Sequence, residues 1–477
     1  MGSRKFFTPF PSLSLFPFKA LYTLLFGVAV LLFFGMAYPH HLHYQEQYQL
    51  FLFDSTYVWE IVKLPGGVAD LLGRFCTQFF LFAWVGALII ALLLSVVQLL
   101  TLRLAIAFTS KAAESGGGWF YGLSFVPSFL LWLFLLDENA LLGGVWTVLL
   151  TLLTAWLIAM LPKGWTQRIA MLVAIPVLYW MVWGNHFHRY PTVFPTLLYA
   201  AWLSAIVIPF IVRIFHKWTN ASSRSIVPLL SFALVAIVMG CLVWKNANFK
   251  AEKVMAYDFM ARYQQWNRIL ETINAEKPNN QIGVTVQNLA LAMQGMLTDQ
   301  MFDYHQNGIA GLLPDVERDA TSPLPTAEVF YQLGMIYVAQ RTVFEAQEAI
   351  LDFQKSARCY KRLAQTNLII GSYDVACKYL TALQKTLFYR DWANETLPLL
   401  GNEAAIAKHP EYGRLRQCAY NEDFYFSDHV TPDILESLFF SNTDSYLAYQ
   451  YLLAYYLLTG DRESYLKLLR DFTPYKR

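Results

Sequence analysis

Seven apolar runs dominate the first half of this chain. They cover residues 20–38, 75–102, 119–136, 140–161, 169–183, 193–212 and 226–244. A helix of about 20 apolar residues crosses the roughly 30 Å hydrocarbon core of a bilayer, and most of the runs come close to this length. The pattern predicts a polytopic helical membrane domain of about seven spans in residues 1–244, with a long loop over residues 40–74 after the first span.

Lysine and arginine are shared unevenly among the gaps between these runs. The N-terminal segment and the second, fourth and sixth gaps hold Arg4, Lys5, Lys19, Arg103, Lys111, Lys163, Arg168, Arg213, Lys217 and Arg224. The other gaps hold only Lys63, Arg74 and Arg189. Loops rich in positive charge stay in the cytoplasm, so we expect a cytoplasmic N-terminus. An odd number of crossings then places residues 245–477 outside the cytoplasm, in the periplasm or its equivalent.

Composition supports a protein that sits in a lipid bilayer. Of the 477 residues, 56% are hydrophobic and 15% are charged, which is too apolar for an ordinary soluble protein. The net charge of +2 gives no electrostatic reason to expect a nucleic-acid partner. The strongest polar groups inside the runs are Gln78, Ser95 and Gln98, which helix–helix hydrogen bonds can satisfy. Ionisable side chains are nearly absent there, which argues against transport of charged species.

Histidines gather in the loops predicted to lie outside. His40, His41 and His43 are in the loop 40–74, and the fifth gap holds His186, His188 and Arg189. Three interpretations remain open: interfacial residues among lipid headgroups, a phosphate-binding or catalytic site for a lipid-linked substrate, or a transition-metal site. The histidine spacings lack a clear anchoring carboxylate, so we predict no metal and no cofactor.

The second half, residues 245–477, has the pattern of short amphipathic helices joined by tight turns. Leu333, Gly334, Tyr337 and Ala346 have the spacing of a tetratricopeptide repeat. We expect Gly334 and Ala346 to let two antiparallel helices approach closely, with Leu333 and Tyr337 filling the seam.

A second copy of this pattern follows about 30 residues later. Ala364 and Ala376 form its small pair, Gly371 lies at the turn, and Tyr373 begins the return helix. A weaker copy has Gly460 at its turn. The pattern predicts an all-α fold ending in a TPR-like helical-repeat domain. Such repeats build a surface that commonly binds a protein, although they also form compact caps.

Several stretches resemble a known family. They are "HYQEQYQLFLF", "PGGVADLLGRFCTQFF", "NLALAMQGMLTDQMFDYHQNGIAGLLP", "TNLIIGSYDVACKYL" and "KTLFYRDWANE". Together they resemble an uncharacterised, domain-of-unknown-function family of multi-pass proteins from Gram-negative bacteria. The resemblance covers most of the chain and implies an inner-membrane location. It implies no catalytic residues.

A looser resemblance is architectural. Glycosyltransferases of the GT-C type, which use polyprenyl-phosphate-linked sugars, have a cytoplasmic N-terminus and a long first outer loop that supplies a carboxylate base. Some members end in tetratricopeptide repeats. The chain is similar in these respects, and the resemblance implies Glu46 or Asp54 as the base. It departs in having seven spans and no adjacent acidic pair near the first span.

The sequence leaves two main hypotheses for function. The first is a non-enzymatic inner-membrane scaffold whose periplasmic TPR-like domain binds a partner protein in envelope assembly or export. The alternative is a GT-C-like transferase, in which Glu46 or Asp54 deprotonates an acceptor hydroxyl. The outer histidines and Arg189 would then hold the donor phosphate. A transporter is the third and weakest interpretation.

Overall fold

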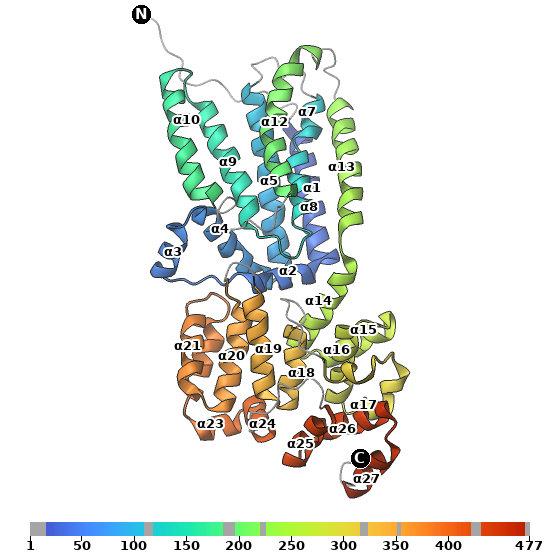
Figure 1. Ribbon diagram of the computed structural model, residues 1–477. Helices are drawn as coiled ribbons and strands as arrows, with labels where there is room; N and C mark the ends of the chain where they lie inside the picture. Colours follow the sequence, from blue (N-terminus) through green and yellow to red (C-terminus); the bar gives the residue numbers. More distant parts are fainter. Residues whose placement is uncertain are drawn as a thin grey trace, which may run out of the picture. The chain divides into compact units, whose positions relative to one another are not determined.

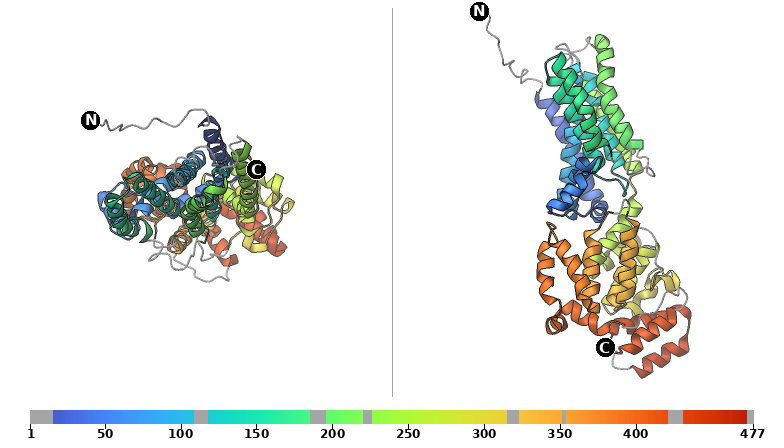
Figure 2. Two further views of the ribbon diagram at one scale, coloured as in Figure 1. Left: turned by 90° about the horizontal axis from the view of Figure 1, so that it is seen from above. Right: turned by 60° about the vertical axis from the view of Figure 1, so that its left-hand side comes forward.

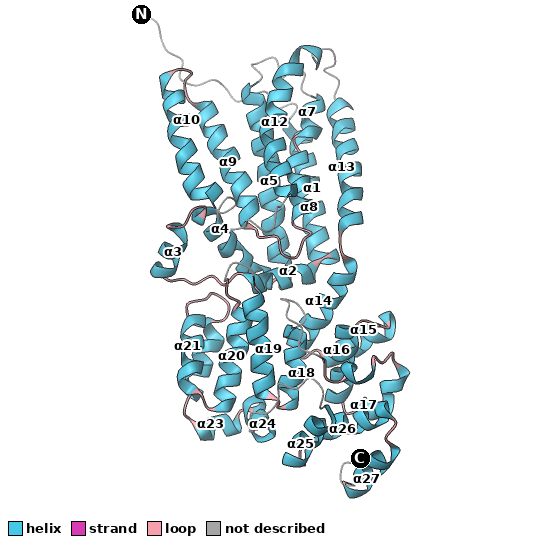
Figure 3. Ribbon diagram, viewed as in Figure 1, coloured by secondary structure: helices cyan, strands magenta, loops and turns pink. Residues whose placement is uncertain are grey.

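The computed structural model describes residues 16–108, 118–184, 196–219, 226–314, 323–350, 354–420 and 431–472 (Figure 1). Every regular element within these ranges is helical (Figure 3). The chain divides into two compact units, and the second unit starts at Phe249. It also includes Glu46–Ser55, which comes from the predicted outer loop 40–74. In this respect the division differs from a simple boundary between residues 244 and 245.

The first unit contains the apolar helices. Five of them are long and apolar enough to cross a membrane: Ala20–Ala37, Ala83–Ala107, Gly143–Met160, Trp165–Trp183 and Val227–Asn246. Its elements are α1 (Phe16–Leu32), η1 (Phe33–Ala37), α2 (Pro39–Gln45), α3 (Ser55–Val62), α4 (Gly67–Thr77), η3 (Gln78–Leu81), α5 (Ala83–Phe108), α7 (Gly118–Leu123), α8 (Val126–Phe134), α9 (Gly143–Met160), α10 (Trp165–Leu178), η4 (Tyr179–Trp183), α12 (Thr196–Thr219) and α13 (Ile226–Asn246).

The second predicted span has different bounds in the structure. The run 75–102 is not one helix, because the backbone at Phe82 is extended (φ −113°, ψ 101°). Helix α4 ends before this break and α5 begins after it. Gly73 explains how α4 can pack closely against α9: a methyl group on Gly73 would lie 2.5 Å from the backbone nitrogen of Gly143. The membrane-length helix therefore starts eight residues later than the hydropathy pattern alone indicates, at Ala83 rather than Phe75.

Two of the polar groups predicted inside the apolar runs differ in their bonding: Gln98 bonds between segments, whereas the amide of Gln78 donates to the carbonyl of Phe75, three residues earlier. Gln98 on α5 accepts a hydrogen bond of 3.0 Å from Thr23 on α1. Its amide nitrogen donates to the hydroxyl of Ser124, 2.9 Å away, at the break between α7 and α8. The prediction that Gln98 is satisfied by helix–helix hydrogen bonds is confirmed. An apolar interior makes an unpaired amide costly, so this chain of bonds fixes how three segments pack.

The second unit is built from shorter helices. Its elements are η2 (Glu46–Tyr48), α14 (Phe249–Arg262), α15 (Trp266–Glu276), α16 (Gln281–Met293), α17 (Leu297–Gln300), η5 (Met301–Asp303), η6 (Gly308–Gly311), α18 (Pro323–Leu333), α19 (Ile336–Ala349), α20 (Ala357–Ile370), α21 (Tyr373–Leu383), α22 (Arg390–Thr396), η8 (Leu397–Leu399), α23 (Glu403–Lys408), α24 (Pro410–Cys418), α25 (Thr431–Ser441), α26 (Tyr446–Thr459) and α27 (Arg462–Asp471). Helices α18 to α21 pack one against the next and lie side by side in the views of Figures 1 and 2.

Three helical hairpins in this unit have the same type of turn. Each turn has a glycine with positive φ followed by one residue: Gly334 (φ 87°), Gly371 (φ 92°) and Gly460 (φ 74°). Glycine is favoured there because it has no Cβ to collide with the backbone in the left-handed conformation. Gly371 and Gly460 lie where the sequence predicts turns.

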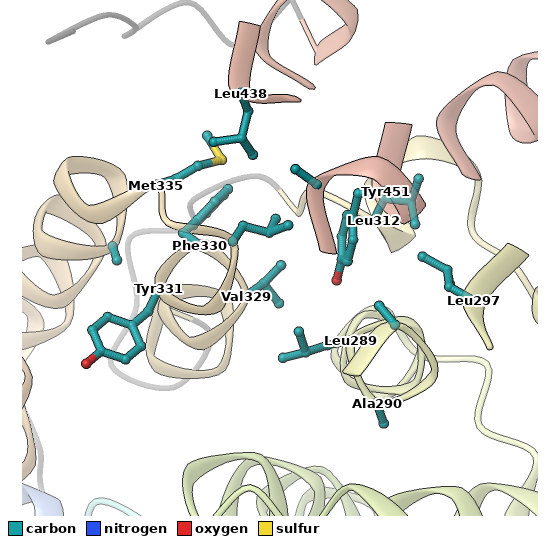
Figure 4. Packing of buried hydrophobic residues seen from close by; sticks show 14 of the residues in the cluster. Leu289, Ala290, Leu297, Leu312, Val329, Phe330, Tyr331, Met335, Leu438 and Tyr451 are labelled. Atoms are coloured by element: carbon teal, nitrogen blue, oxygen red, sulfur yellow. The ribbon is translucent and has the colours of Figure 1, made fainter. Parts of the chain in front are cut away.

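The largest apolar core of the second unit joins helices that are far apart in sequence. Figure 4 shows Leu289 and Ala290 of α16, Val329 and Phe330 of α18, and Tyr451 of α26 within one cluster. Leu289, Val329 and Tyr451 are fully buried. The late helices α25 to α27 therefore complete a core that begins with α14, and the second unit is one packed body.

Candidate functional site

The most distinctive site in the second unit surrounds residues 46–55, which we call the inserted segment. It starts with the short turn η2, and residues 49–54 are neither helix nor strand. The segment packs on α14, α20, α21 and α22. Its backbone is held at two points: the amide of Leu50 donates to the carbonyl of Lys355, and the amide of Phe53 donates to the carbonyl of Lys385, each over 2.7 Å.

Apolar side chains fix the middle of the inserted segment. Leu50 is 6% exposed and belongs to a buried cluster, with Leu52 packed against its edge. The helices contribute Ala357, Ala364, Leu380, Leu383, Tyr389 and Ala393 to this cluster. Two of the stretches that carry the family resemblance, "HYQEQYQLFLF" and "KTLFYRDWANE", therefore meet in space.

Glu46 enters a buried polar network at the start of the segment. Its Oε1 accepts a hydrogen bond of 2.9 Å from the hydroxyl of Tyr389. Its Oε2 lies 3.6 Å from Nη1 of Arg262. Arg262 also donates to the hydroxyl of Tyr389 over 2.7 Å. Burial, together with the Glu46 carboxylate, raises the pKa of Tyr389 well above its usual range, although Arg262 opposes this shift. Tyr389 is therefore a neutral donor.

A bidentate ion pair lies one helical turn away. Arg358 of α20 donates to both carboxylate oxygens of Asp258 on α14, over 2.6 and 2.8 Å. Nη1 of Arg358 also donates to the side-chain oxygen of Gln47, 3.2 Å away. All three residues are buried. Charge-assisted bidentate pairs have a defined geometry, so this pair fixes α14 against α20 while also holding the inserted segment.

The network continues along α20. Arg362 is paired with Glu328 of α18, and its guanidinium lies 3.6 Å from the ring centroid of Tyr331. Between the two arginines of α20, the ammonium of Lys361 lies 4.8 Å from the ring centroid of Trp392. Burial, together with the positive charges of the neighbouring Arg262 and Arg362, lowers the pKa of Lys361 to about 8.

Asp54 lies at the other end of the inserted segment. Its carboxylate accepts a hydrogen bond of 2.6 Å from the ammonium of Lys385. The Asp54 side chain is 24% exposed and that of Lys385 45%. Glu46 and Asp54 thus occur in one segment but bind different cations. A general base needs an acceptor atom within reach of the substrate proton, whereas the oxygens of Glu46 are buried and face Arg262 and Tyr389.

The predicted histidine site is described only in part. His40, His41 and His43 lie on α2, in the first unit. The Nε2 of His41 lies 2.9 Å from the carbonyl oxygen of Leu135, and burial lowers the pKa of His41 to about 4. The rings of His40 and His43 lie 5.6 Å apart. Their predicted companions in the fifth gap, His186, His188 and Arg189, lie outside the described residues.

The repeat-packing residues follow the sequence pattern with two corrections, at Gly334 and Tyr337. Gly334 does not lie between two packed helices, because α18 ends at Leu333 and Gly334 forms the turn to α19. Tyr337 then falls on the first turn of α19 and is 37% exposed, so it does not fill the seam. Leu333 and Ala346 are buried as expected.

The second copy of the pattern forms the hairpin α20–α21. Its two small residues pack in different apolar clusters. Ala364 and Ala376 are both fully buried. Ala364 packs in the cluster that holds Leu50, and Ala376 belongs to the main core. Tyr373 begins α21, and its hydroxyl is bound to Arg416 over 3.0 Å and to Glu403.

Sequence reasoning missed the partners of the inserted segment. These are Arg262, Arg358, Lys385 and Tyr389, with Asp258 as the counter-ion of Arg358. One signal was available: Asp258 and Arg262 are four positions apart on α14, and Arg358 and Arg362 are four apart on α20, so each pair lies on one helix face. In the described part of the chain, no group of three or more metal-ligating side chains is positioned to hold an ion.

The fold defines the class as an all-helical protein with several apolar helices of membrane-spanning length. The family model that matches, described as "Family of unknown function (DUF6057)", covers residues 14–188 and 182–477. The chain therefore belongs to this family. No curated protein and no solved structure matches it.

Proposed function

We propose that the chain is a scaffold of the bacterial inner membrane with seven spans and a cytoplasmic N-terminus. Its second unit is a TPR-like domain on the periplasmic side, which binds a protein partner in envelope assembly or export. Two apolar helices shorter than a full span, Phe120–Phe134 and Thr196–Ile211, would complete the seven. The distribution of lysine and arginine among the loops supports the orientation.

The observation that carries this proposal is the way the second unit holds the inserted segment. Helices α20, α21 and α22 bind a non-helical stretch through backbone carbonyls and an apolar surface. Proteins recognise extended peptides by this combination, in which main-chain hydrogen bonds give affinity and pockets for side chains give specificity.

The environment of Glu46 favours a scaffold over a glycosyltransferase. A catalytic base has to reach an acceptor hydroxyl, whereas Glu46 is 4% exposed and bound by Tyr389 and Arg262. Asp54 is more accessible, but its carboxylate is paired with Lys385. Both carboxylates have a clear role in attaching the inserted segment.

The proposal is tested by purifying the tagged full-length protein in mild detergent and identifying bound proteins and lipids by mass spectrometry. The test variant is Tyr337→Ala with Phe344→Ala, because these side chains are 37% and 42% exposed and lie two turns apart on α19. Leu466→Ala on α27, where the side chain is 46% exposed, is the matched control. Tyr373 is unsuitable because its hydroxyl bonds to Arg416.

We expect a near-stoichiometric protein that the control retains and the α19 variant loses. A retained polyprenyl phosphate or its sugar conjugate, with no protein partner, would overturn the scaffold proposal. In that case, loss of glycosyltransferase activity in a Glu46→Gln or Asp54→Asn protein that still folds would identify which carboxylate is the general base.

A further inference from the structure

The inserted segment has the form of a bound peptide ligand. Residues 49–54 are not helical, and the amide of Asp54 donates to the carbonyl of Leu52 over 2.9 Å, which makes a tight turn at Phe53. Leu50 and Leu52 both pack against the cluster formed by α20, α21 and α22. Phe53 is 46% exposed. Phe51 is buried but lies outside this cluster, with its ring centroid 5.1 Å from that of Phe53, so Leu50 and Leu52 are the side chains that face the helices.

The surface that receives the segment is made from helix ends. The carbonyl of Lys355 lies just before α20, and that of Lys385 lies just after α21. Neither carbonyl lies within a helix, where the amide four residues later would bond to it, so both are available to the amide of an incoming chain. The segment satisfies these two carbonyls with the amides of Leu50 and Phe53.

The charges at the two ends define the ligand further. The ammonium of Lys385 binds Asp54, two positions after Leu52. Arg262 and Tyr389 bind Glu46, four positions before Leu50. The site therefore recognises two apolar side chains two positions apart, followed by a carboxylate two positions later and preceded by a second carboxylate.

We propose that the surface of α20, α21 and α22 is a peptide-binding site occupied by the chain's own inserted segment. The partner presents a non-helical acidic segment of the same pattern, which displaces residues 46–55. This inference rests on the proposed function and specifies where a non-helical segment of the partner binds, in addition to the exposed face of α19.

The inserted segment is a strong competitor because it is covalently attached. A tethered ligand has an effective concentration on the order of millimolar, so a free peptide binds the intact protein weakly. Weakening the segment, or cutting one of its two attachments, lowers this competition without changing any residue of the receiving surface.

The experiment measures binding of a fluorescein-labelled synthetic peptide of residues 44–56 to the full-length protein in detergent. One test protein carries Leu50→Asp and Asp54→Lys in the inserted segment. A second carries a protease site between Ser55 and Thr56 and is cut after purification, so that its fold is established first. Thermal unfolding checks that both remain folded. A control peptide carries the Leu50→Asp change.

We expect both test proteins to bind the wild-type peptide saturably and at least ~10-fold more tightly than the uncut wild-type protein. The control peptide should bind at least ~10-fold more weakly than the wild-type peptide, the effect of losing one buried leucine. Equal binding of the two peptides, or no binding by folded test proteins, would overturn the inference. A captured partner alongside such a failure would leave the proposed function standing, whereas peptide binding without any partner would count against it.

Discussion

The hydroxyl of Tyr389 donates a hydrogen bond of 2.9 Å to the carboxylate of Glu46, which lies 343 positions earlier in the chain. Both side chains are buried, and Arg262 bonds to the tyrosine from α14. A loop residue between the first two apolar helices is therefore part of the interior of the second unit. The site we describe depends on this long-range relationship.

Tyr389→Phe should lower the free energy of unfolding by about 1–3 kcal/mol, because it leaves a buried carboxylate oxygen and a guanidinium nitrogen without their partner. Tyr337→Phe, at an exposed position, should change it by less than about 0.5 kcal/mol. Denaturant unfolding of the purified protein in detergent measures both. Equal effects of the two substitutions would show that the buried hydroxyl does not stabilise the second unit.

Arg358→Met should lower the free energy of unfolding more than Tyr389→Phe does, because it leaves Asp258 buried without its cation. Removing one member of a buried ion pair costs about 3–5 kcal/mol. The same denaturation experiment on Glu345→Gln provides the control, since the Arg341–Glu345 pair is 3.9 Å apart and partly exposed. Such surface pairs contribute about 0–1 kcal/mol. A small effect of Arg358→Met would contradict a structural role for the bidentate pair.

Gly334→Ala and Gly371→Ala should destabilise the protein to different extents, although both glycines have positive φ. The left-handed backbone costs an alanine about 1–2 kcal/mol at either position. At Gly371 nothing lies within 4 Å of the added carbon, whereas at Gly334 it would lie 2.5 Å from the carbonyl oxygen of Cys418. We expect a larger fall in melting temperature for Gly334→Ala. The reverse order would argue against the close approach of Gly334 to the end of α24.

The lowered pKa of Lys361 predicts a pH dependence of stability. Its pKa is about 8 in the folded protein against an ordinary 10.5. Between these values the unfolded chain binds more protons than the folded chain, so the free energy of unfolding rises with pH. The pKa values of Cys359 and the buried tyrosines are raised, and these groups have the opposite effect on stability. The wild type is therefore compared with Lys361→Met, which isolates the contribution of Lys361. From about pH 8 upward, the free energy of unfolding of the wild type should increase relative to that of Lys361→Met. A difference between the two proteins that does not change with pH would contradict the prediction.

Thiol labelling distinguishes the two cysteines of the α20–α21 hairpin. Cys377 is exposed, whereas Cys359 is buried and burial raises its pKa to about 11. Because the thiolate is the reactive form, a variant with only Cys377 should be alkylated much faster than one with only Cys359, as measured by intact mass. A membrane-impermeant maleimide should label Cys377 in spheroplasts. Labelling only after the membrane is opened would contradict the proposed orientation.

The sequence predicted those features that depend on local pattern. Hydropathy located the apolar helices, and glycine chemistry located the turns at Gly371 and Gly460. The start of α5 was misplaced because the run 75–102 stays apolar through the break at Phe82. Gly334 was expected between two packed helices, although it forms the turn from α18 to α19, because residue spacing alone does not show where a helix ends.

The sequence predicted the two carboxylates of the candidate site but not their partners. Glu46 and Asp54 were selected as acidic residues in an outer loop, but a spacing pattern carries no information on partners that lie hundreds of positions away. Arg262, Lys385 and Tyr389 sit in ordinary amphipathic helices or turns, where an arginine, lysine or tyrosine is usually on a solvated face. Their role became visible only once the chain was folded.

The inserted segment also has a consequence for inheritance. The second unit is encoded by two separate stretches of the gene, with most of the membrane helices between them. Recombination that moved residues 249–477 to another membrane anchor would leave Glu46, Gln47 and Leu50 behind, and with them the groups that fill the surface of α20 to α22. The two units should therefore be inherited together, and an exchange between relatives would have to carry the short loop as well.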